Sequence, residues 1–566
     1  MARAGACSIC AGIAMLATVA ACGGGDGGGG ADLPAEAAPD VVSEVVTDDP
    51  GDLPADVPSE ASPDPASDPV SDAAADPAGD ASPDPAPDAA PDLAADLPAG
   101  DAAPDLPWLP AAPGGFRRTG DAIVDDAGRT VFLHGVNVSN AAKYLPGNQA
   151  WHAAQDFATL AAAGIDSVRL LAFWSAVMPQ EGVIDTAYLD EYARRVQWAA
   201  DAGLLVVIDM HQDLFGVGFH EDGAPLWACD AANYDAYVPT QPWYLNYLSP
   251  QVRACFDRFY TDDALFARFV EAWVAIADRF RDHPAVVGFD LLNEPNPGTF
   301  EASRFVSDLW QPRQEQVAAA LSAVAPDRLA FFQGATMLAY GVVDPFVPGP
   351  APRVAFAPHY YLPSLHDGGE YDHDTMADMV DVAFDAVAQS AANLGGVPVW
   401  MGEWGGPTTV AGFDTYLEDI LSRFASRRWS HAIYSDDAGG FGIRLPDLSI
   451  APHLACRLGH PHLRRVPGPV ASQDLAFDPS GVQAFTAVFE WKSPSAPLVA
   501  WTGPAIPGAT TACTLDPPGD TPPRPCADFP CTGFPSPAPG LLEACASPGA
   551  PPGPWVLSLR WTPETP

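Results

Sequence analysis

The chain has 566 residues, with 72 acidic side chains against 27 basic ones and a formal net charge of −45. Such an acidic excess, without a cluster of Lys or Arg, argues against a nucleic-acid-binding protein, because contacts to phosphate need cations. Only part of the charge belongs to folded sequence: residues 117–566 carry 51 acidic and 26 basic side chains, a charge of about −25.

Residues 1–21 have the pattern of a bacterial lipoprotein signal. Arg3 stands near the start, an apolar stretch runs from Ile9 to Val19, and small residues lead into Cys22. The pattern predicts cleavage before Cys22 and lipid attachment to its thiol, with an ordinary signal peptide as the alternative. No apolar run of transmembrane length follows, so the membrane contact would be the lipid. We therefore expect an exported lipoprotein of the cell envelope or surface, with the outer membrane favoured.

Residues 22–115 form a low-complexity segment rich in Asp, Ala and Pro. Acidic residues occupy every fourth position from Asp32 to Asp96, and no Lys or Arg occurs between Arg3 and Arg117. The dense prolines prevent a helix, and no apolar face accompanies the charges. The segment is predicted to be a disordered, extended tether. A partner-binding acidic tail is the alternative.

Residues 116–461 alternate apolar strands with amphipathic helices, which predicts an α/β fold. Helical spacing of apolar residues marks Trp151–Ala163, Ala187–Ala202 and Ala264–Arg281. Eight strand–helix units favour a (β/α)8 TIM barrel over an open doubly wound sheet, because no Gly-rich phosphate turn follows the first strand. The predicted strands are Val131–Val138, Ser167–Ala172, Leu204–Met210, Val286–Leu292, Leu329–Gln333, Val354–Pro358, Pro398–Gly402 and Ala432–Ser435.

Residues 462–566 change to short β-rich runs separated by Pro and Gly, namely Ala484–Trp491, Leu498–Trp501 and Trp555–Trp561. They predict a small C-terminal all-β, sandwich-like domain. Four cysteines in the last part of the chain suggest a disulfide-stapled region, as in exported proteins. Cys229 and Cys255 bracket one aromatic-rich loop and are expected to pair, which leaves Cys456 as the odd thiol. The cysteine spacings fit no common zinc pattern.

Two apolar strands each run directly into a single Glu followed by turn residues. One is Val286–Leu292 with Asn293-Glu294-Pro295, and the other is Val397–Met401 with Gly402-Glu403-Trp404. In a TIM barrel the carboxyl ends of the strands meet at the active site. Two carboxylates placed there can supply the acid and the nucleophile of glycoside hydrolysis. The alternative is that either Glu merely caps its turn.

Polar residues near the other strand ends complete a candidate site. They are Asn137, Lys143, Arg169, His211, Asp213, Asn293, His359 and Tyr361. A pocket of carboxylates, donors and aromatic rings suits a sugar, whose hydroxyls need polar partners and whose apolar face stacks on a ring. His211 and Asp213 could also be a metal pair, but the sequence offers no third ligand at usable spacing, so we expect neither metal nor cofactor.

The Asn-Glu-Pro and Gly-Glu-Trp motifs resemble glycoside hydrolase family five, of the retaining (β/α)8 clan. Several longer segments are similar to its endoglycoceramidase-related branch. They are Asp209-Met210-His211-Gln212-Asp213, Asp222-Gly223-Ala224-Pro225, Phe289 to Pro295, Ser139 to Tyr144, and Pro358-His359-Tyr360-Tyr361. The resemblance covers the barrel and extends loosely into the β domain.

The resemblance implies that Glu294 is the acid/base and Glu403 the nucleophile. Arg169 would keep Glu403 charged, Tyr361 could donate to it, and Asn293 would contact the sugar 2-hydroxyl. Lys143, His211 and Asp213 would hold the glycone. Arg169 could instead be a structural ion-pair partner, and Asn137 could support the fold rather than the sugar.

The sequence departs from that family at two places. Tyr434 stands where the eighth strand commonly ends in Trp, so either Tyr434 or Trp429 would serve as the stacking platform. Leu226 occupies a position where relatives tend to carry a carboxylate. Trp227, Trp243, Tyr244 and Tyr247, in the loop after the third strand, form either a substrate lid or a self-packed loop.

The resulting hypothesis is a lipid-anchored, monomeric retaining β-glycosidase that hydrolyses a glycolipid, foremost a glycosylceramide. A glucosylceramidase or steryl-glucosidase and a β-glucan endoglucanase are the alternatives within the family. A carbohydrate-binding lectin on an inactive barrel is the alternative of another class.

Overall fold

The computed structural model describes residues 115–335, 341–492, 496–504, 506, 508–519, 522–531, 539–546 and 552–563. The predicted signal segment, the lipid-attachment residue Cys22 and nearly all of the predicted tether lie outside the described residues. These expectations therefore stay predictions.

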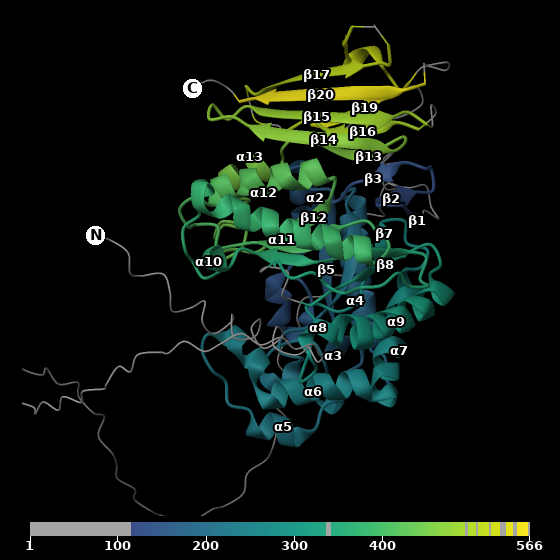
Figure 1. Cartoon of the computed structure of the whole chain (residues 1–566), viewed down its shortest axis with the longest axis vertical. Coiled ribbons are helices and arrows are strands. Elements are labelled where there is room, and N and C mark those ends of the chain that lie inside the picture. The colour runs from purple at the N-terminus through teal and green to yellow at the C-terminus, as the bar shows by residue number, and fades with distance from the viewer. Residues whose placement is uncertain are drawn as a thin grey trace, which may run out of the picture. The chain divides into compact units, whose positions relative to one another are not determined.

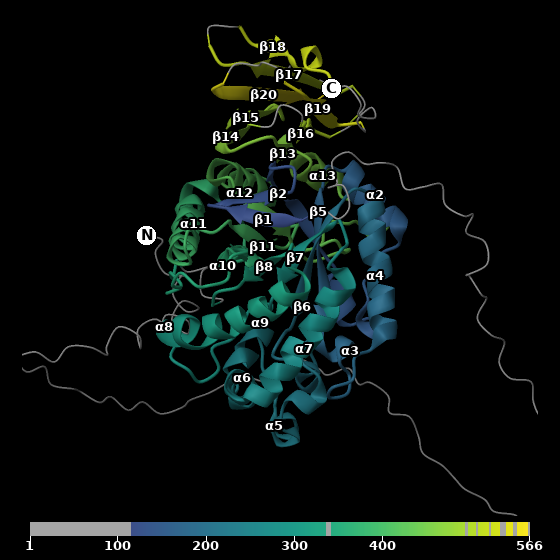
Figure 2. The ribbon, with the colours of Figure 1, turned by 90° about the vertical axis from the view of Figure 1, so that its right-hand side faces the viewer.

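The centre of the fold is a parallel sheet of nine strands that closes on itself as a barrel. Figure 2 shows strands of this sheet among the surrounding helices. Its strands are β4 (His134–Val138), β5 (Ser167–Phe173), β6 (Leu205–His211), β7 (Val286–Asp290), β8 (Leu329–Phe332), β9 (Val354–Phe356), β10 (His359–Tyr361), β11 (Trp400–Gly405) and β12 (Ser430–Ile433). β9 and β10 are two pieces of the sixth barrel strand. A bridge from Phe356 to Val399 joins β9 to the chain entering β11, and β12 pairs with β4. The predicted TIM barrel is confirmed.

Helices between the strands cover the barrel (Figure 1). The longer ones are α2 (Ala154–Ala162), α4 (Thr186–Asp201), α6 (Pro250–Thr261), α7 (Asp263–Phe280), α9 (Gln311–Val324), α11 (His373–Asn393) and α12 (Phe413–Arg427). α7 shows why they form. Asp262 caps its first turn by accepting from the N–H groups of Ala264 and Leu265, and an apolar face that includes Trp273 is buried.

Shorter segments build the loops at the carboxyl ends of the strands. They are η1 (Asn140–Lys143), η2 (Pro146–Asn148), α3 (Trp174–Val177), η3 (Val217–Phe219), η4 (Leu226–Ala228), α5 (Ala231–Ala236), η5 (Trp243–Leu248), α8 (Ala302–Phe305), η6 (Val306–Trp310) and α10 (Pro363–His366). No helix in the described residues is both long enough and apolar enough to cross a membrane.

The predicted strand Val131–Val138 is in fact two strands with different partners. β3 (Thr130–Val131) joins β1 (Phe116–Thr119) and β2 (Ala122–Asp125) in a sheet with C-terminal strands, whereas β4 enters the barrel. The sequence pattern shows one apolar run because both halves are buried. The chain changes sheet at Phe132 and Leu133.

The C-terminal strands form two antiparallel sheets, which confirms the predicted β domain. After α13 (Pro452–Leu458), β13 (His462–Val466), β16 (Leu498–Trp501) and β19 (Leu541–Ala544) extend the sheet of β1–β3. The second sheet contains β14 (Val470–Phe477), β15 (Gln483–Glu490), β17 (Thr510–Asp516), β18 (Arg524–Pro525) and β20 (Pro554–Thr562), and η8 (Cys526–Asp528) follows β18. Figure 1 shows the two sheets as layers.

Three disulfides hold loops of the fold. Cys229 pairs with Cys255, as predicted, and the C-terminal region contains Cys513–Cys526 and Cys531–Cys545. Cys456 is the free thiol among the described residues. The first bridge ties the chain before α5 to α6 and so fixes both ends of the aromatic-rich loop.

Candidate active site

The inward-facing positions of the barrel strands change from apolar to polar along each strand. In β6, Leu205 and Val207 belong to an apolar cluster within the barrel, and Asp209 and His211 follow at the same two-residue spacing. In β8, Phe331 of that cluster is followed by Gln333. The base of the barrel is therefore a packed core, and its carboxyl end is a polar cavity floor.

Glu403 is buried and held by two donors. Its Oε1 accepts from Arg169 Nη1 at 2.6 Å, and its Oε2 accepts from the Tyr361 hydroxyl at 2.8 Å. Burial, together with the charge of Glu403, raises the pKa of Tyr361, so the phenol keeps the proton that it donates. A charged donor on one oxygen and a hydroxyl donor on the other fix the orientation of the Glu403 carboxyl group.

Arg169 is the centre of a buried network. Its guanidinium contacts Asp209 at 2.7 Å and Asp290 at 2.9 Å, besides Glu403. Burial alone would lower the pKa of Arg169, but the three carboxylates outweigh burial and hold the pKa well above its ordinary value. Arg169 forms structural ion pairs with Asp209 and Asp290 and also contacts Glu403. A structural role and a role at Glu403 are therefore compatible.

Two amides complete the Arg169 network. Asn137 accepts from Arg169 at 3.0 Å and donates to the carbonyl of Gly402 at 2.9 Å, so this side chain supports the fold. Asn293 accepts from Arg169 at 3.0 Å and donates to the carbonyl of Gln212 at 3.1 Å. One N–H of the Asn293 amide remains for a substrate hydroxyl.

Glu294 has a strained backbone position. Its φ is 42°, in the left-handed region that non-glycine residues rarely adopt. Its N–H donates to Gln333 Oε1 at 2.9 Å, and Gln212 donates to its carbonyl at 3.0 Å. The surrounding side chains thus hold the turn that aims Glu294 into the cavity.

His359 bridges the two glutamates. Its Nδ1 lies 3.0 Å from Glu294 Oε1 and 3.7 Å from Glu403 Oε2. Gln333 indicates the tautomer of His359. Its Oε1 accepts from the N–H of Glu294. Its Nε2 is therefore a donor, which lies 2.9 Å from Asp290 and 3.3 Å from His359 Nε2. His359 Nε2 is therefore the acceptor from Gln333, and Nδ1 donates to Glu294.

The two carboxyl groups are close. Oxygens of Glu294 and Glu403 lie within 4.8 Å of each other, shorter than the ~6.5–9.5 Å of inverting enzymes. Burial raises the pKa of Glu294, but the hydrogen bond from His359 and the charges of Lys143 and Arg169 outweigh burial and place the pKa below its ordinary value.

A second polar group lies beside the pair, at the side of β4 and β6. Lys143 Nζ is 2.6 Å from Asp213 Oδ2 and lies 5.4 Å from the centre of the Tyr434 ring. His211 Nδ1 is 2.7 Å from Asp209, and burial with the charges of Lys143 and Arg169 lowers its pKa, so the ring is neutral. The structure brings these residues, expected to bind substrate, close together.

Asp222 is a third potential ligand beside His211 and Asp213, which corrects the expectation that none exists. Acceptor atoms of the three residues lie within 4.8 Å of one another. The loop after β6 folds back so that Asp213 N–H donates to the Asp222 carbonyl, a contact that sequence spacing does not reveal. The ammonium group of Lys143 already supplies the cation at this place.

Tyr434 and Trp429, the two rings considered for the end of the eighth strand, lie in different places. Tyr434 faces Lys143, and its hydroxyl donates to Asn140 at 2.7 Å. Trp429 packs instead against Phe384 and Arg427, in the helical layer. Tyr434 is therefore the ring available to a sugar, and Trp429 is not. Leu226, the other departure, is exposed.

The aromatic loop contributes one residue to the site. Tyr247 of η5 donates to Asp213 at 3.3 Å, whereas Trp227 packs on Trp174 and donates to the Met178 carbonyl. Tyr247 was named from the sequence only as part of a possible substrate lid, and Gln333 was not among the predicted site residues. Gln333 ends a predicted strand and could have been found by the strand-end rule.

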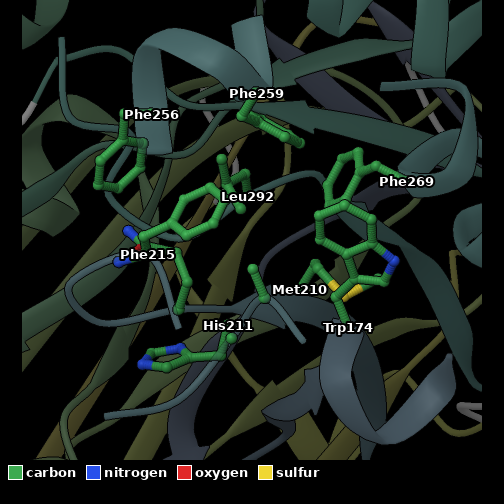
Figure 3. Close-up of a pocket in the computed structure, with 11 residues that line it drawn as sticks. Trp174, Met210, His211, Phe215, Phe256, Phe259, Phe269 and Leu292 are labelled. Carbon is green, nitrogen blue, oxygen red and sulfur yellow. The ribbon is translucent and has the colours of Figure 1, made fainter. Parts of the chain in front are cut away.

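An apolar cavity lies beside His211 (Figure 3). Its walls include Trp174, Phe215, Phe256 and Phe269. Trp174 belongs to α3, Phe256 to α6 and Phe269 to α7, and Phe215 lies in the loop after β6. This cavity is a feature of the core rather than the sugar site, because neither glutamate lines it.

The barrel and the paired carboxylates define the class of retaining glycoside hydrolases. The family model for cellulases (glycosyl hydrolase family 5) matches residues 124–439, and the chain belongs to this family.

Several relatives are similar over part of the chain. Endoglycoceramidase I of Rhodococcus hoagii is 39% identical over 191 residues, which cover 33% of this chain and 37% of the relative. Endoglycoceramidase of Cyanea nozakii is 27% identical, over 43% of this chain and 55% of the relative. The matched regions thus span about a third to a half of these curated relatives.

Solved structures match more of the chain. Endo-glycoceramidase II from Rhodococcus sp., in its complex with ganglioside GM3, has a TM-score of 0.67 and 26% identity and covers 79% of this chain and 100% of the other. Its complex with a cellobiose-like imidazole has a TM-score of 0.66 and 27% identity, over 78% of this chain and 99% of the other.

Proposed function

We propose that the chain is a retaining β-glycosidase that hydrolyses the glycosidic bond of a glycosylceramide-type glycolipid. The observation that carries the proposal is the pair of glutamates. Arg169 and Tyr361 fix Glu403, and His359 holds Glu294. Oxygens of the two glutamates lie within 4.8 Å of each other. The names of the endoglycoceramidase relatives support the choice of substrate.

In the first step Glu403 attacks the anomeric carbon. A carboxylate oxygen of Glu403 forms the new C–O bond while the bond to the leaving oxygen breaks. Glu294 transfers its proton to that oxygen, and the released group leaves as an alcohol. Tyr361 and Arg169 orient the nucleophile, and the remaining N–H of Asn293 is placed to donate to the sugar.

In the second step the roles of Glu294 reverse. As a carboxylate it takes a proton from water, the water oxygen attacks the anomeric carbon, and the ester bond to Glu403 breaks with its electrons returning to the carboxylate. Two inversions give net retention. The hydrogen bond from His359 favours the carboxylate form of Glu294, which is the form this step uses.

Lys143, His211, Asp213 and Tyr434 supply the contacts for the sugar to be cleaved. The ammonium and the carboxylate of the Lys143–Asp213 pair offer a donor and acceptors to adjacent hydroxyls, and His211 Nε2 is buried with no partner among the described residues. Tyr434 supplies a ring face beside them.

Apolar side chains on the loops around the site support an amphiphilic substrate. Tyr144, which follows η1, is 67% exposed, Leu226 of η4 is 62% exposed, and Trp243 of η5 is 40% exposed. All three come from loops that follow β4 or β6, at the catalytic end of the barrel. Such a rim suits the acyl and sphingoid chains of a glycolipid.

Export as a monomer with a lipid on Cys22 is part of the proposal. The three disulfides support an oxidising compartment. Expression in a bacterial host with labelled palmitate should label the wild type and not Cys22→Ser. Equal labelling of both would contradict the anchor.

The activity is tested with protein that begins at residue 116, incubated with glycosphingolipids, glucosylceramide, steryl glucoside and cellulose oligosaccharides. Release of intact oligosaccharide plus ceramide supports the proposal. Cleavage of only the single-sugar lipids would favour a glucosylceramidase or steryl-glucosidase, and cleavage of only cellulose fragments would favour an endoglucanase. Binding without turnover, retained in Glu403→Gln, would favour a lectin.

A further inference from the structure

Four histidines lie together at the end of the barrel opposite to Glu294 and Glu403. His134 begins β4, and His431, near the start of β12, is its neighbour in the parallel register. His460 and His462 come from the segment that leads from α13 into β13. All four side chains are buried, although imidazole is usually partly exposed in proteins.

Each ring of this histidine cluster has a nitrogen that is buried and has no hydrogen-bond partner among the described residues. They are Nδ1 of His134 and His431, and Nε2 of His460 and His462. A buried polar atom without a partner costs free energy, and such atoms need an explanation in a folded protein. Nδ1 of His134 and Nε2 of His462 face Asp166 Oδ2 at 3.7 and 3.9 Å, beyond hydrogen-bond distance. His431 Nδ1 and His460 Nε2 are buried without a partner among the described residues, which points to a shared ligand rather than to isolated defects.

The hydrogen bonds of the cluster show which atoms carry lone pairs. His460 Nδ1 lies 2.9 Å from the Pro461 carbonyl, so Nδ1 bears the proton and Nε2 is the acceptor. A ring nitrogen that donates to a backbone carbonyl while the other nitrogen is free is the arrangement of metal-bound histidines.

Three of the four rings have the mutual geometry of ligands. Nitrogens of His134, His431 and His460 lie within 4.8 Å of one another. The ring centre of His134 is 5.0 Å from that of His431 and 5.7 Å from that of His460, each at a steep angle. Two imidazoles on a tetrahedral ion with Zn–N of ~2.0–2.1 Å place their ring centres about 5 Å apart.

His462 and Asp166 form a competing set with His134 that fits less well. The rings of His462 and His134 are stacked at 3.9 Å, so their lone pairs do not converge. Oδ2 of Asp166 faces Nδ1 of His134 and Nε2 of His462, and it also lies 3.8 Å from Arg464 Nε, which already supplies a cation there.

We propose that His134, His431 and His460 bind one divalent transition-metal ion, for which Zn²⁺ is the best match in ligand type and geometry. The ion would link the first and last barrel strands to the segment that enters the β domain. The site shares no residue with the proposed catalytic site, so a test of metal binding stands apart from the test of activity.

The experiment uses the full chain, purified without a polyhistidine tag, stripped with a chelator and equilibrated with Zn²⁺. Metal content is measured after gel filtration by mass spectrometry. We expect about one Zn²⁺ per chain in the wild type and at least a tenfold loss in His460→Gln and in His431→Gln. His373→Gln, at an exposed position, is the matched control and should retain the ion, and so should His462→Gln.

Thermal unfolding of the wild type tests the metal site even if the variants do not fold. Because an ion that binds only the folded state raises its stability, Zn²⁺ should raise the Tm of the stripped wild type, and the chelator should reverse the shift. Wild-type protein that retains no Zn²⁺ and shows no shift would refute the site. Loss of the ion in His462→Gln but not in His460→Gln would also refute this ligand set.

Discussion

Replacing His359 should move the pH dependence of the reaction in a defined direction. In the structure His359 Nδ1 donates to Glu294 Oε1 at 3.0 Å and contributes to the lowered pKa of Glu294. His359→Leu keeps a similar volume and removes the donor. Without it the carboxylate form of Glu294 loses stabilisation, so the pKa of Glu294 rises.

The magnitude follows from the kind of hydrogen bond. A hydrogen bond to a charged group contributes about 1.5–3 kcal/mol, and one pKa unit corresponds to about 1.4 kcal/mol. The pKa of Glu294 should therefore rise by about 1–2 units. A general acid must hold its proton, so the alkaline limb of kcat/KM should move to higher pH by the same amount.

The assay is the pH profile of kcat/KM on two aryl β-glycosides, one with a poor leaving group and one with an activated leaving group. The shift should appear with the poor leaving group, which needs the proton from Glu294, and be small with the activated one. His359→Asn retains an N–H donor near Nδ1 and is the matched control. An alkaline limb that stays in place, or moves to lower pH, in His359→Leu would refute the assignment of Glu294 as the acid.

Three further changes, and Arg279→Met as a control for one of them, test the site and the disulfide of the aromatic-rich loop. Tyr361→Phe removes the 2.8 Å hydrogen bond that the Tyr361 hydroxyl donates to Glu403, so kcat should fall about 10–100-fold with the fold intact. An unchanged kcat would contradict the role of Tyr361. Arg169→Met leaves three buried carboxylates without their cation and should lower the free energy of unfolding by about 3–5 kcal/mol, measured in urea. Arg279→Met breaks only an exposed pair and should cost less than about 1 kcal/mol; equal losses would refute the network. Cys255→Ser opens the aromatic loop and should cost about 3–4 kcal/mol in the same assay, and no loss would contradict the bridge.

The sequence predicted the fold well because its strands are buried on both faces. Runs such as Leu204–Met210 stand out between amphipathic helices, and the observed strand differs from that range by one residue at each end. The division of Val131–Val138 between two sheets was missed, since burial looks the same whichever partner a strand takes.

The site was predictable where a polar side chain follows a strand directly. Glu294 and Glu403 follow this rule, whereas Arg169 lies within β5, and the structure brings the three together. Asp222 and Tyr247 reach the site only because a long loop folds back on itself, and sequence spacing carries no record of that. The histidine cluster was missed because its members are far apart along the chain.

The most direct test of the proposed mechanism is to trap the glycosyl–enzyme. A 2-deoxy-2-fluoro-β-glycoside with an activated leaving group slows the second step more than the first, so the ester accumulates. Mass spectrometry of the intact protein and of its peptic peptides should show about one sugar per chain, on the peptide that contains Glu403. A label on Glu294, or turnover of the natural substrate with inversion at the anomeric carbon, would contradict the account.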